Sequence, residues 1–309
     1  MSLYLAIDAG GTKTDYLLAD CTSENDTREL ARVRSGTIKR MRADTDTVVA
    51  NLDEGLTQLA QRAGISLQSV ACTCIGISGA SVPLVTEWLR EALAARVSGS
   101  LLLLGDIEIA LDAAFRGAPG VLVLAGTGSN VAGRNHSGTI TTAGGWGPVL
   151  GDQGSGYGIG MSAIRALCMA IDAGQETPLL AAVLKLWNLT SVDEMIALAN
   201  SLPAPDFPSL TQVVLACAQQ GDPVAAGVLQ RQGEHLAKIV RLVIDRLIRD
   251  APDPKWLPSI AFAGSIMESV TPVRDSLIAA LRRDYPALTT LPGVVDPIAG
   301  ALWRARTVH

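Results

Sequence analysis

IDAGGTKTDYLLAD, residues 7–20, joins two apolar stretches through one short polar turn. The pattern predicts a strand, a tight turn at Gly10 and Gly11, and a second strand that returns immediately. Such a turn can direct several backbone N–H groups into one concavity, where Thr12 and Thr14 add hydroxyl donors for phosphate oxygens. An ordinary hairpin needs only the two glycines, so this segment by itself leaves a phosphate loop and a plain turn equally open.

The turn differs from the best-known phosphate-loop pattern. It lacks the Gly-x-x-x-x-Gly-Lys-Ser/Thr spacing, and a strand follows it where that pattern requires a helix. Asp8 stands at the end of the first strand, where its carboxylate could hold magnesium through a water molecule. The choice between the two interpretations therefore depends on the rest of the chain.

Strands and helices alternate in the first part of the chain. Strands are expected at residues 2–8, 14–20, 29–36, 70–78 and 101–106, and helices at 45–64, 86–96 and 107–117. Residues 121–135, VLVLAGTGSNVAGRN, then repeat the opening order of strand, glycine turn and strand. This repetition predicts an α/β protein with two domains of one plan, residues 1–117 and 118–309, facing each other across a cleft. The last helix, about 296–309, is expected to pack back on the first domain.

The second glycine turn strengthens the phosphate interpretation. Gly126, Thr127 and Gly128 offer the same kinds of donor as the first turn, so two domains could hold one triphosphate. A third turn, Gly264 and Ser265, follows the strand expected at residues 260–264 and permits the close backbone approach that an adenosine needs. Together the three turns favour ATP.

Asp106 is the candidate catalytic base. It follows LLLLG at the carboxyl end of a buried strand, the edge at which open α/β sheets bind ligands. In phosphoryl transfer an aspartate commonly accepts the proton of the attacking hydroxyl. The same position also suits an aspartate that caps the following helix, and the two roles are compatible.

Glycines are frequent in residues 144–160, GGWGPVLGDQGSGYGIG, ahead of a helix expected to begin near Met161. Their spacing does not match the dinucleotide fingerprint. Trp146 and Asp152 can present an aromatic face and hydrogen-bond acceptors to a polyhydroxylated ligand such as a sugar. A hinge between domains is the alternative. Farther on, Asp222 and Pro223 predict the start of a long helix that ends near Arg249.

Composition narrows the class of protein. The chain has 309 residues and a net charge of -5, and it lacks the clustered Lys and Arg that a nucleic-acid partner requires. Asp8 interrupts the apolar start too early for a signal peptide, and no apolar run is long enough for a membrane span. We therefore expect a cytoplasmic protein without nucleic-acid or membrane partners. The five cysteines lack metal-binding spacing and are expected in the core.

Several motifs in this order resemble the N-acetylglucosamine kinase family, which is related to the BadF/BadG/BcrA/BcrD ATPases. They are DAGGTKT, the LLLLGD aspartate, LAGTGSN, GGWGPVLGDQGSG and FAGS, and they extend over most of the chain. The resemblance implies an actin-like ATPase fold of two ribonuclease-H-like domains. It also implies phosphorylation of an amino sugar, most simply N-acetylglucosamine, with ATP and Mg²⁺, by a homodimer.

The resemblance assigns roles to individual residues. Asp106 becomes the base for the sugar 6-hydroxyl. The residues implied around the phosphates, the magnesium and the nucleotide are Asp8, Gly10, Gly11, Thr12, Thr127, Gly264 and Ser265. Those implied to contact the sugar are Asn130, Gly145, Trp146 and Asp152.

One loop departs from the family pattern. The family usually places an asparagine after the third strand to hold the sugar, whereas this loop reads SGTIKRMRADTD. Thr37 could replace one hydrogen bond of that amide but not its paired donor and acceptor. Glucosamine, or another amino sugar, therefore remains open as the substrate.

Two other functions are alternatives to the kinase. An ATPase that activates an iron–sulfur dehydratase needs thiolates for a cluster, yet no cysteine lies between residues 75 and 167. A sugar sensor without catalysis would not need both Asp8 and Asp106. The ROK sugar kinases perform similar chemistry but carry a cysteine-rich zinc motif that this sequence lacks.

Overall fold

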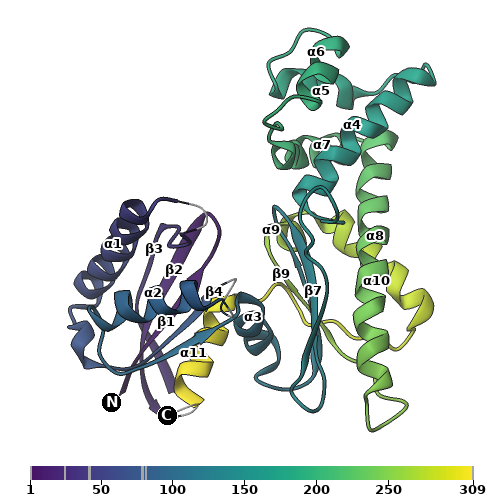
Figure 1. Ribbon diagram of the computed structural model, residues 1–309. Helices are drawn as coiled ribbons and strands as arrows, with labels where there is room; N and C mark the ends of the chain where they lie inside the picture. The colour runs from purple at the N-terminus through teal and green to yellow at the C-terminus, as the bar shows by residue number, and fades with distance from the viewer. Residues whose placement is uncertain (1, 24–25, 41–42, 78–79, 81, 308–309) are drawn as a thin grey trace. The chain divides into compact units, whose positions relative to one another are not determined.

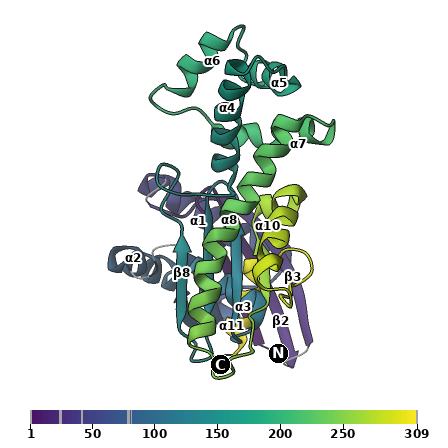
Figure 2. The ribbon, with the colours of Figure 1, turned by 90° about the vertical axis from the view of Figure 1, so that its right-hand side faces the viewer.

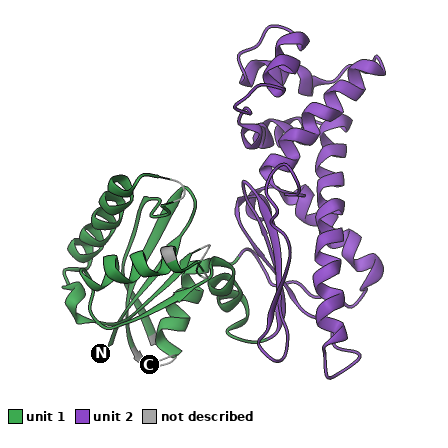
Figure 3. Cartoon of the chain, viewed as in Figure 1, with its two compact units in different colours: residues 1–118, 295–309 green, residues 119–294 purple. Residues whose placement is uncertain are grey.

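The computed structural model describes residues 2–307 except 24–25, 41–42, 78–79 and 81 (Figure 1). The chain forms two compact units, coloured separately in Figure 3. The first contains residues 1–118 and 295–309, and the second contains residues 119–294. The chain therefore leaves the first unit once and returns to it for its last helix.

The first unit is built on a five-stranded mixed sheet of order β3-β2-β1-β4-β5. Its strands are β1 (Ser2–Ala9), β2 (Lys13–Ser23), β3 (Asp26–Gly36), β4 (Val70–Ile77) and β5 (Ser100–Leu104). The first three form an antiparallel meander, and β4 and β5 run parallel to β1. The strands expected from the sequence are confirmed.

Helices cover both faces of this sheet. They are α1 (Thr45–Ala63), α2 (Pro83–Ala94), α3 (Asp106–Phe115) and α11 (Pro297–Thr307), with a short 3-10 turn, η1, at Leu67–Ser69. Because side chains alternate along a strand, Leu5 and Ile7 of β1 face the core under α1 and α2. Ala6 belongs to the opposite core, which contains residues of α3 and α11. In Figure 1, α11 lies against the strands of this unit although it ends the chain.

A close backbone approach joins α11 to α3. A Cβ placed on Gly300 would lie 1.8 Å from the carbonyl oxygen of Ile109, so only glycine fits there. Nearby, the Arg304 guanidinium donates from Nε to Oδ2 of the fully buried Asp112 over 2.9 Å. Steric fit and a buried charge pair thus both attach the end of the chain to the first unit.

The second unit contains a four-stranded sheet of order β8-β7-β6-β9. Its strands are β6 (Gly120–Ala125), β7 (Ser129–Arg134), β8 (Ile140–Gly144) and β9 (Ile260–Ala263). An antiparallel meander followed by a strand parallel to its first member repeats the arrangement of β1, β2, β3 and β4. Both units thus have the same plan at their glycine turns.

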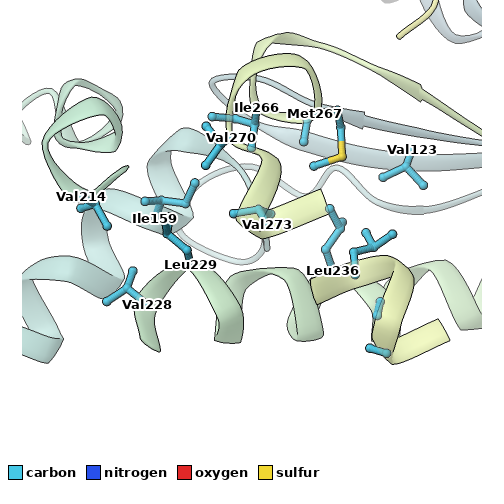
Figure 4. Packing of buried hydrophobic residues seen from close by; sticks show 14 of the residues in the cluster. Val123, Ile159, Val214, Val228, Leu229, Leu236, Ile266, Met267, Val270 and Val273 are labelled. Atoms are coloured by element: carbon cyan, nitrogen blue, oxygen red, sulfur yellow. The ribbon is translucent and has the colours of Figure 1, made fainter. Parts of the chain in front are cut away.

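Helices make up the remainder of the second unit. They are α4 (Gly156–Asp172), α5 (Pro178–Leu186), α6 (Val192–Ala199), α7 (Leu210–Gln219), α8 (Pro223–Arg249), α9 (Ser265–Ser269) and α10 (Thr271–Asp284), with η2 at Phe207–Ser209. The long helix α8 runs beside β8 with α10 at its side (Figure 2). Its residues Val228, Leu229 and Leu236 pack in one core with Ile159 of α4 and Val273 of α10 (Figure 4). The predicted start of this helix is confirmed, because Asp222 accepts hydrogen bonds from the amides at its first turn.

The start of α4 differs from the prediction. The helix begins at Gly156 and not near Met161, with Ser155 as its N-cap. A Cβ on Gly160 would lie 2.0 Å from the carbonyl oxygen of Phe207, and one on Gly158 would lie 2.6 Å from that of Asp152. These glycines allow the first turns of the helix to pack against neighbouring backbone, so tertiary packing overrides their low helix propensity.

None of the described helices combines the length and the apolar character that a bilayer crossing requires.

We expect Gly300→Ala to destabilise the protein by about 2 kcal/mol or more, because α11 or α3 must move to accept the methyl group. Gly227→Ala is the matched control, since the added Cβ would meet only the flexible end of Arg231, at 3.0 Å. That control should be neutral or gain up to about 1 kcal/mol from helix propensity. Urea unfolding followed by far-ultraviolet circular dichroism measures both, and equal midpoints for the two variants would contradict the close-approach explanation.

Candidate active site

Two carboxylates stand opposite each other in the sheet of the first unit. Asp8 of β1 and Asp15 of β2 are direct cross-strand partners, and both point to the face covered by α3 and α11. Burial, together with the negative charges of Asp15 and Asp106, raises the pKa of Asp8 to about 6. The site therefore holds more negative charge than its surroundings easily accommodate.

Asp106 is the first residue of α3, directly after β5. The helix N-cap is Gly105, whose amide donates to Glu108 Oε2 over 2.7 Å. Asp106 Oδ1 accepts from the adjacent amide of Ile107 over 3.0 Å, and 37% of its side chain is exposed. Glu108 therefore meets the needs of the helix start, and the Asp106 carboxylate remains accessible for chemistry.

Lys39 is a site residue that the sequence interpretation missed. Its Nζ lies 3.8 Å from Asp106 Oδ2, and only 12% of its side chain is exposed. Its positive charge lowers the pKa of Asp8, in opposition to burial and the neighbouring carboxylates. The sequence signal for this residue is the lysine within the loop SGTIKRMRADTD, in which the sequence analysis considers only the absence of an asparagine.

The other carboxylates of this face have cationic partners. Asp15 Oδ1 accepts from Arg34 Nε over 2.7 Å, and Asp296 Oδ2 accepts from Arg32 over the same distance. Among the described residues, Asp8 forms no side-chain ion pair. A partly buried carboxylate with an elevated pKa and no ion pair is suited to an added cation.

Magnesium fits this donor set. Mg²⁺ commonly uses one or two protein carboxylates, with phosphate oxygens and waters completing its shell. No group of three or more His, Cys, Asp or Glu within the described part of the chain is arranged as an all-protein metal site. A metal that enters with a nucleotide needs no such group, so Asp8 can serve as its protein contact.

The first glycine turn is exposed at its tip and held at its base. Gly11 and Thr12 are exposed, whereas the carbonyl of Gly10 accepts from Thr37 Oγ1 over 2.9 Å. A Cβ on Gly10 would lie 2.7 Å from the carbonyl oxygen of Lys13, which explains the glycine. The tip can therefore present donors to a ligand while its base stays fixed.

Two of the predicted site threonines are placed differently from the prediction. Thr14 is fully buried, because strand alternation points it with Tyr16 toward the core under α1 and away from the Asp8 face. Thr37 uses its hydroxyl proton on the Gly10 carbonyl and accepts from the Lys39 amide at 3.1 Å. Thr14 thus has no access to a phosphate in this structure, and the Thr37 hydroxyl has no proton left to donate to a sugar.

Backbone hydrogen bonds from α4 fix the second glycine turn. The amides of Gly156 and Tyr157 donate to the carbonyls of Gly126 and Thr127 over 2.8 and 3.2 Å. Within the turn, the Gly126 amide donates to the Gly128 carbonyl over 2.9 Å. The Thr127 side chain remains exposed at the tip. The carbonyl groups of this turn are therefore held in place, and the Thr127 hydroxyl is accessible to a ligand.

The third turn lies beside the second. Gly264 has φ 91°, and a Cβ there would lie 2.3 Å from the carbonyl oxygen of Ala125 at the end of β6. A Cβ on Gly126 would lie 3.8 Å from Ser265 Oγ. The parallel pairing of β6 with β9 thus brings together two of the three turns that the sequence analysis singled out.

Asp152 holds the second turn through a hydrogen bond to its backbone. Its Oδ1 accepts from the Ser129 amide over 3.2 Å, its side chain is 6% exposed, and its backbone has φ 63°. Next to it, Asn130 lies against Gly145, where a Cβ would be 2.9 Å from the Asn130 Cγ. Asn130 Oδ1 is buried without a hydrogen-bond partner among the described residues. The amide is thus close-packed and retains unused acceptor capacity.

The loop after β8 carries three exposed apolar side chains. Trp146, Val149 and Leu150 are 74%, 88% and 77% exposed. The exposed ring of Trp146 can stack on a ligand, and its role in sugar binding stays a prediction.

The sequence model of the BadF/BadG/BcrA/BcrD ATPase family matches residues 5–305. The chain belongs to this family. The resemblance noted in the sequence is thereby confirmed, and the two α/β units with their glycine turns are this family member's version of an actin-like fold.

Relatives of this family member cover nearly the whole chain. The N-acetylmuramic acid/N-acetylglucosamine kinase of Clostridium acetobutylicum is 28% identical over 99% of both chains. The N-acetyl-D-glucosamine kinase of Dictyostelium discoideum is 28% identical over 97% of this chain and 96% of its own.

Solved structures agree on the fold. A candidate N-acetylglucosamine kinase from Chromobacterium violaceum, 27% identical, matches with a TM-score of 0.74 over 98% of both chains. A ROK family glucokinase from Streptomyces griseus, solved with glucose and AMPPNP, matches with a TM-score of 0.63 at 16% identity over 99% of both chains. The second comparison shows the fold alone.

We expect Asp8→Asn to stabilise the magnesium-free protein at pH 7.5 but much less at pH 4. The raised pKa means that the folded state prefers protonated Asp8, so ionisation costs stability as pH rises from 3.8 to about 6. The full cost, at most about 3 kcal/mol, is present above that range and is removed by the substitution. Urea unfolding at the two pH values measures it.

Asp53→Asn is the control, because its expected effect on stability is opposite to that of Asp8→Asn. Arg96 lowers the pKa of Asp53, so its charge contributes stability above the ordinary pKa and that contribution is lost as pH falls. This variant should lose stability at pH 7.5. If Asp8→Asn behaved in the same way, the charge-strain explanation of Asp8 would be wrong.

Proposed function

We propose that this protein is an ATP-dependent amino-sugar kinase that phosphorylates the 6-hydroxyl of N-acetylglucosamine. The observation that carries the proposal is the Asp106 carboxylate: Oδ1 accepts from the helix start, whereas Oδ2 lies beside Lys39 in one charged site with Asp8. The names of the two relatives, each 28% identical over nearly the whole chain, support the kinase activity and the class of substrate.

Asp106 acts in this proposal as the general base. It accepts the proton of the sugar 6-hydroxyl while that oxygen forms a bond to the γ-phosphorus and the bond to the β-phosphate oxygen of ATP breaks. Its partial exposure gives the sugar access, and the Lys39 ammonium lies 3.8 Å from its Oδ2. The products are ADP and a sugar 6-phosphate.

The phosphates are held by turns and one acidic residue. Mg²⁺, when bound with ATP, would neutralise charge on the phosphates, and Asp8 would hold it, in keeping with the absence of an ion pair to Asp8 among the described residues. Gly10, Gly11 and Thr12 present donors from the first unit. Thr127 presents its exposed hydroxyl from the second unit.

Other residues of the second unit recognise the nucleotide and the sugar. Gly126 and Gly128 shape the phosphate turn, and Gly264 and Ser265 flank the adenosine, in keeping with their placement side by side. Asn130 offers its unused carbonyl oxygen to the sugar, and Trp146 offers a ring face. Asp152 and Gly145 complete this group, with Asp152 acting largely by holding the turn.

The iron–sulfur activator is not favoured by the cysteines of this chain. Cys72 and Cys74 are buried in the core beneath α3 and α11, and burial raises the pKa of the Cys74 thiol to about 12. A thiol of that kind remains protonated and packs as an apolar group, whereas a cluster needs thiolates.

The proposed activity predicts Mg²⁺-dependent ADP release from ATP that one amino sugar stimulates. A coupled assay with N-acetylglucosamine, glucosamine, N-acetylmannosamine, glucose or no sugar measures it, and mass spectrometry with fragmentation locates the phosphate. Equal ADP release with and without sugar would replace the kinase by a sugar-independent ATPase.

Asp106→Asn should lower kcat by about 100-fold or more while ATP binding is retained, because an amide cannot accept the hydroxyl proton. Glu108→Gln is the matched control two residues away, and it should retain most activity because it alters only the helix start. Initial rates and equilibrium binding of an ATP analogue separate the two effects. Wild-type turnover in Asp106→Asn would remove Asp106 as the base.

A further inference from the structure

The segment Thr37 to Lys39 is held rigidly against the first glycine turn. Thr37 Oγ1 donates to the Gly10 carbonyl over 2.9 Å and accepts from the Lys39 amide at 3.1 Å. From α1, Asn51 Nδ2 donates to the Thr37 carbonyl over 2.9 Å, and Ile38 is completely buried. The backbone of Lys39 is therefore fixed relative to the phosphate turn.

The Lys39 side chain points into the carboxylate site. Lysine usually extends its ammonium into water, yet this one is 12% exposed and lies 3.8 Å from Asp106 Oδ2. Removing an ammonium from water is costly, so its place beside the proposed base needs a reason beyond folding. Its charged neighbours are Asp106 of α3, with which it pairs, and Asp8 of β1, whose pKa its charge lowers; Asp15 and Asp296 in turn act on Asp8.

This lysine stands in the loop where the family resemblance implied a sugar-binding asparagine. An asparagine amide is neutral and both donates and accepts hydrogen bonds, whereas an ammonium only donates and carries a full charge. A lysine in this loop therefore allows the site to distinguish substrates by their charge.

We propose that Lys39 selects sugars by charge, disfavouring hexosamines with a free protonated amine and favouring N-acylated or carboxylate-bearing amino sugars. The inference rests on the proposed function, because Asp106 is the group that meets the sugar 6-hydroxyl. Lys39 does not need to contact the sugar directly, since a charge acts over roughly 8–10 Å before physiological salt screens it. Lys39 thus resolves the choice between glucosamine and N-acetylglucosamine in favour of the second.

A series of three sugars with the same 6-hydroxyl tests the proposal. Glucosamine is cationic, N-acetylglucosamine is neutral and N-acetylmuramic acid is anionic, and kcat/KM is measured for each with the wild type and Lys39→Met. Relative to N-acetylglucosamine, the variant should gain about tenfold on glucosamine and lose about tenfold on N-acetylmuramic acid, each equal to about 1.4 kcal/mol. Lys39→Arg should keep the wild-type order.

Arg40→Met is the control for removing one positive charge from the same loop. Arg40 is exposed, and its guanidinium carbon lies 6.0 Å from the centre of the Trp88 ring. This control should leave the ratios between the sugars unchanged. Urea midpoints verify folding, and Lys39→Gln replaces Lys39→Met if the latter does not fold.

The outcomes separate this inference from the proposed function. Phosphorylation of none of the three sugars by the wild type would overturn both. Phosphorylation of N-acetylglucosamine with the same sugar ratios in wild type and Lys39→Met would leave the kinase intact and overturn charge selection. A ratio shift of the same size in Arg40→Met would also overturn it, because the effect would then be one of general surface charge.

Discussion

Repulsion between carboxylates is the constraint on which the first unit depends. Asp8 and Asp15 are direct cross-strand partners on one face of the sheet, and α3 and the segment before α11 add Asp106 and Asp296 to that face. Each of these charges is costly unless a cation is close. Arg34, Arg32 and Lys39 supply cations to three of the four, whereas Asp8 has no ion pair among the described residues.

In the second unit, the contacts that matter are those that hold its glycine turns in place. Its turns are held by backbone hydrogen bonds from α4, by the Asp152 carboxylate on the Ser129 amide, and by glycines where a Cβ would collide with backbone. Apart from the Asp152 carboxylate, these contacts are made by uncharged groups. Polyphosphate recognition by amides and hydroxyls is compatible with this arrangement, because it depends on donors being preorganised.

Much of this could be predicted from local patterns. Spacing and strand periodicity predict both glycine hairpins, the start of α8 at Asp222 and the position of Asp106 after a strand. That strand, β5, is a partly exposed edge strand and not the buried strand expected. Thr14 shows the limit, because its face depends on where β2 begins. Lys39 shows another, since the direction of a loop side chain is set by hydrogen bonds to Gly10 and Asn51 that no local pattern contains. The pairing of Arg32 with Asp296 joins residues far apart in the chain.

The return of the chain to its first unit has a consequence for synthesis. Gly300 packs against the Ile109 carbonyl, and Ile298 and Leu302 of α11 belong to the same core as Ala6 and Cys74. These contacts join residues far apart in the chain. The second unit is contiguous and can complete its core while elongation continues. The first unit must wait, with part of one sheet face uncovered, until α11 has been synthesised.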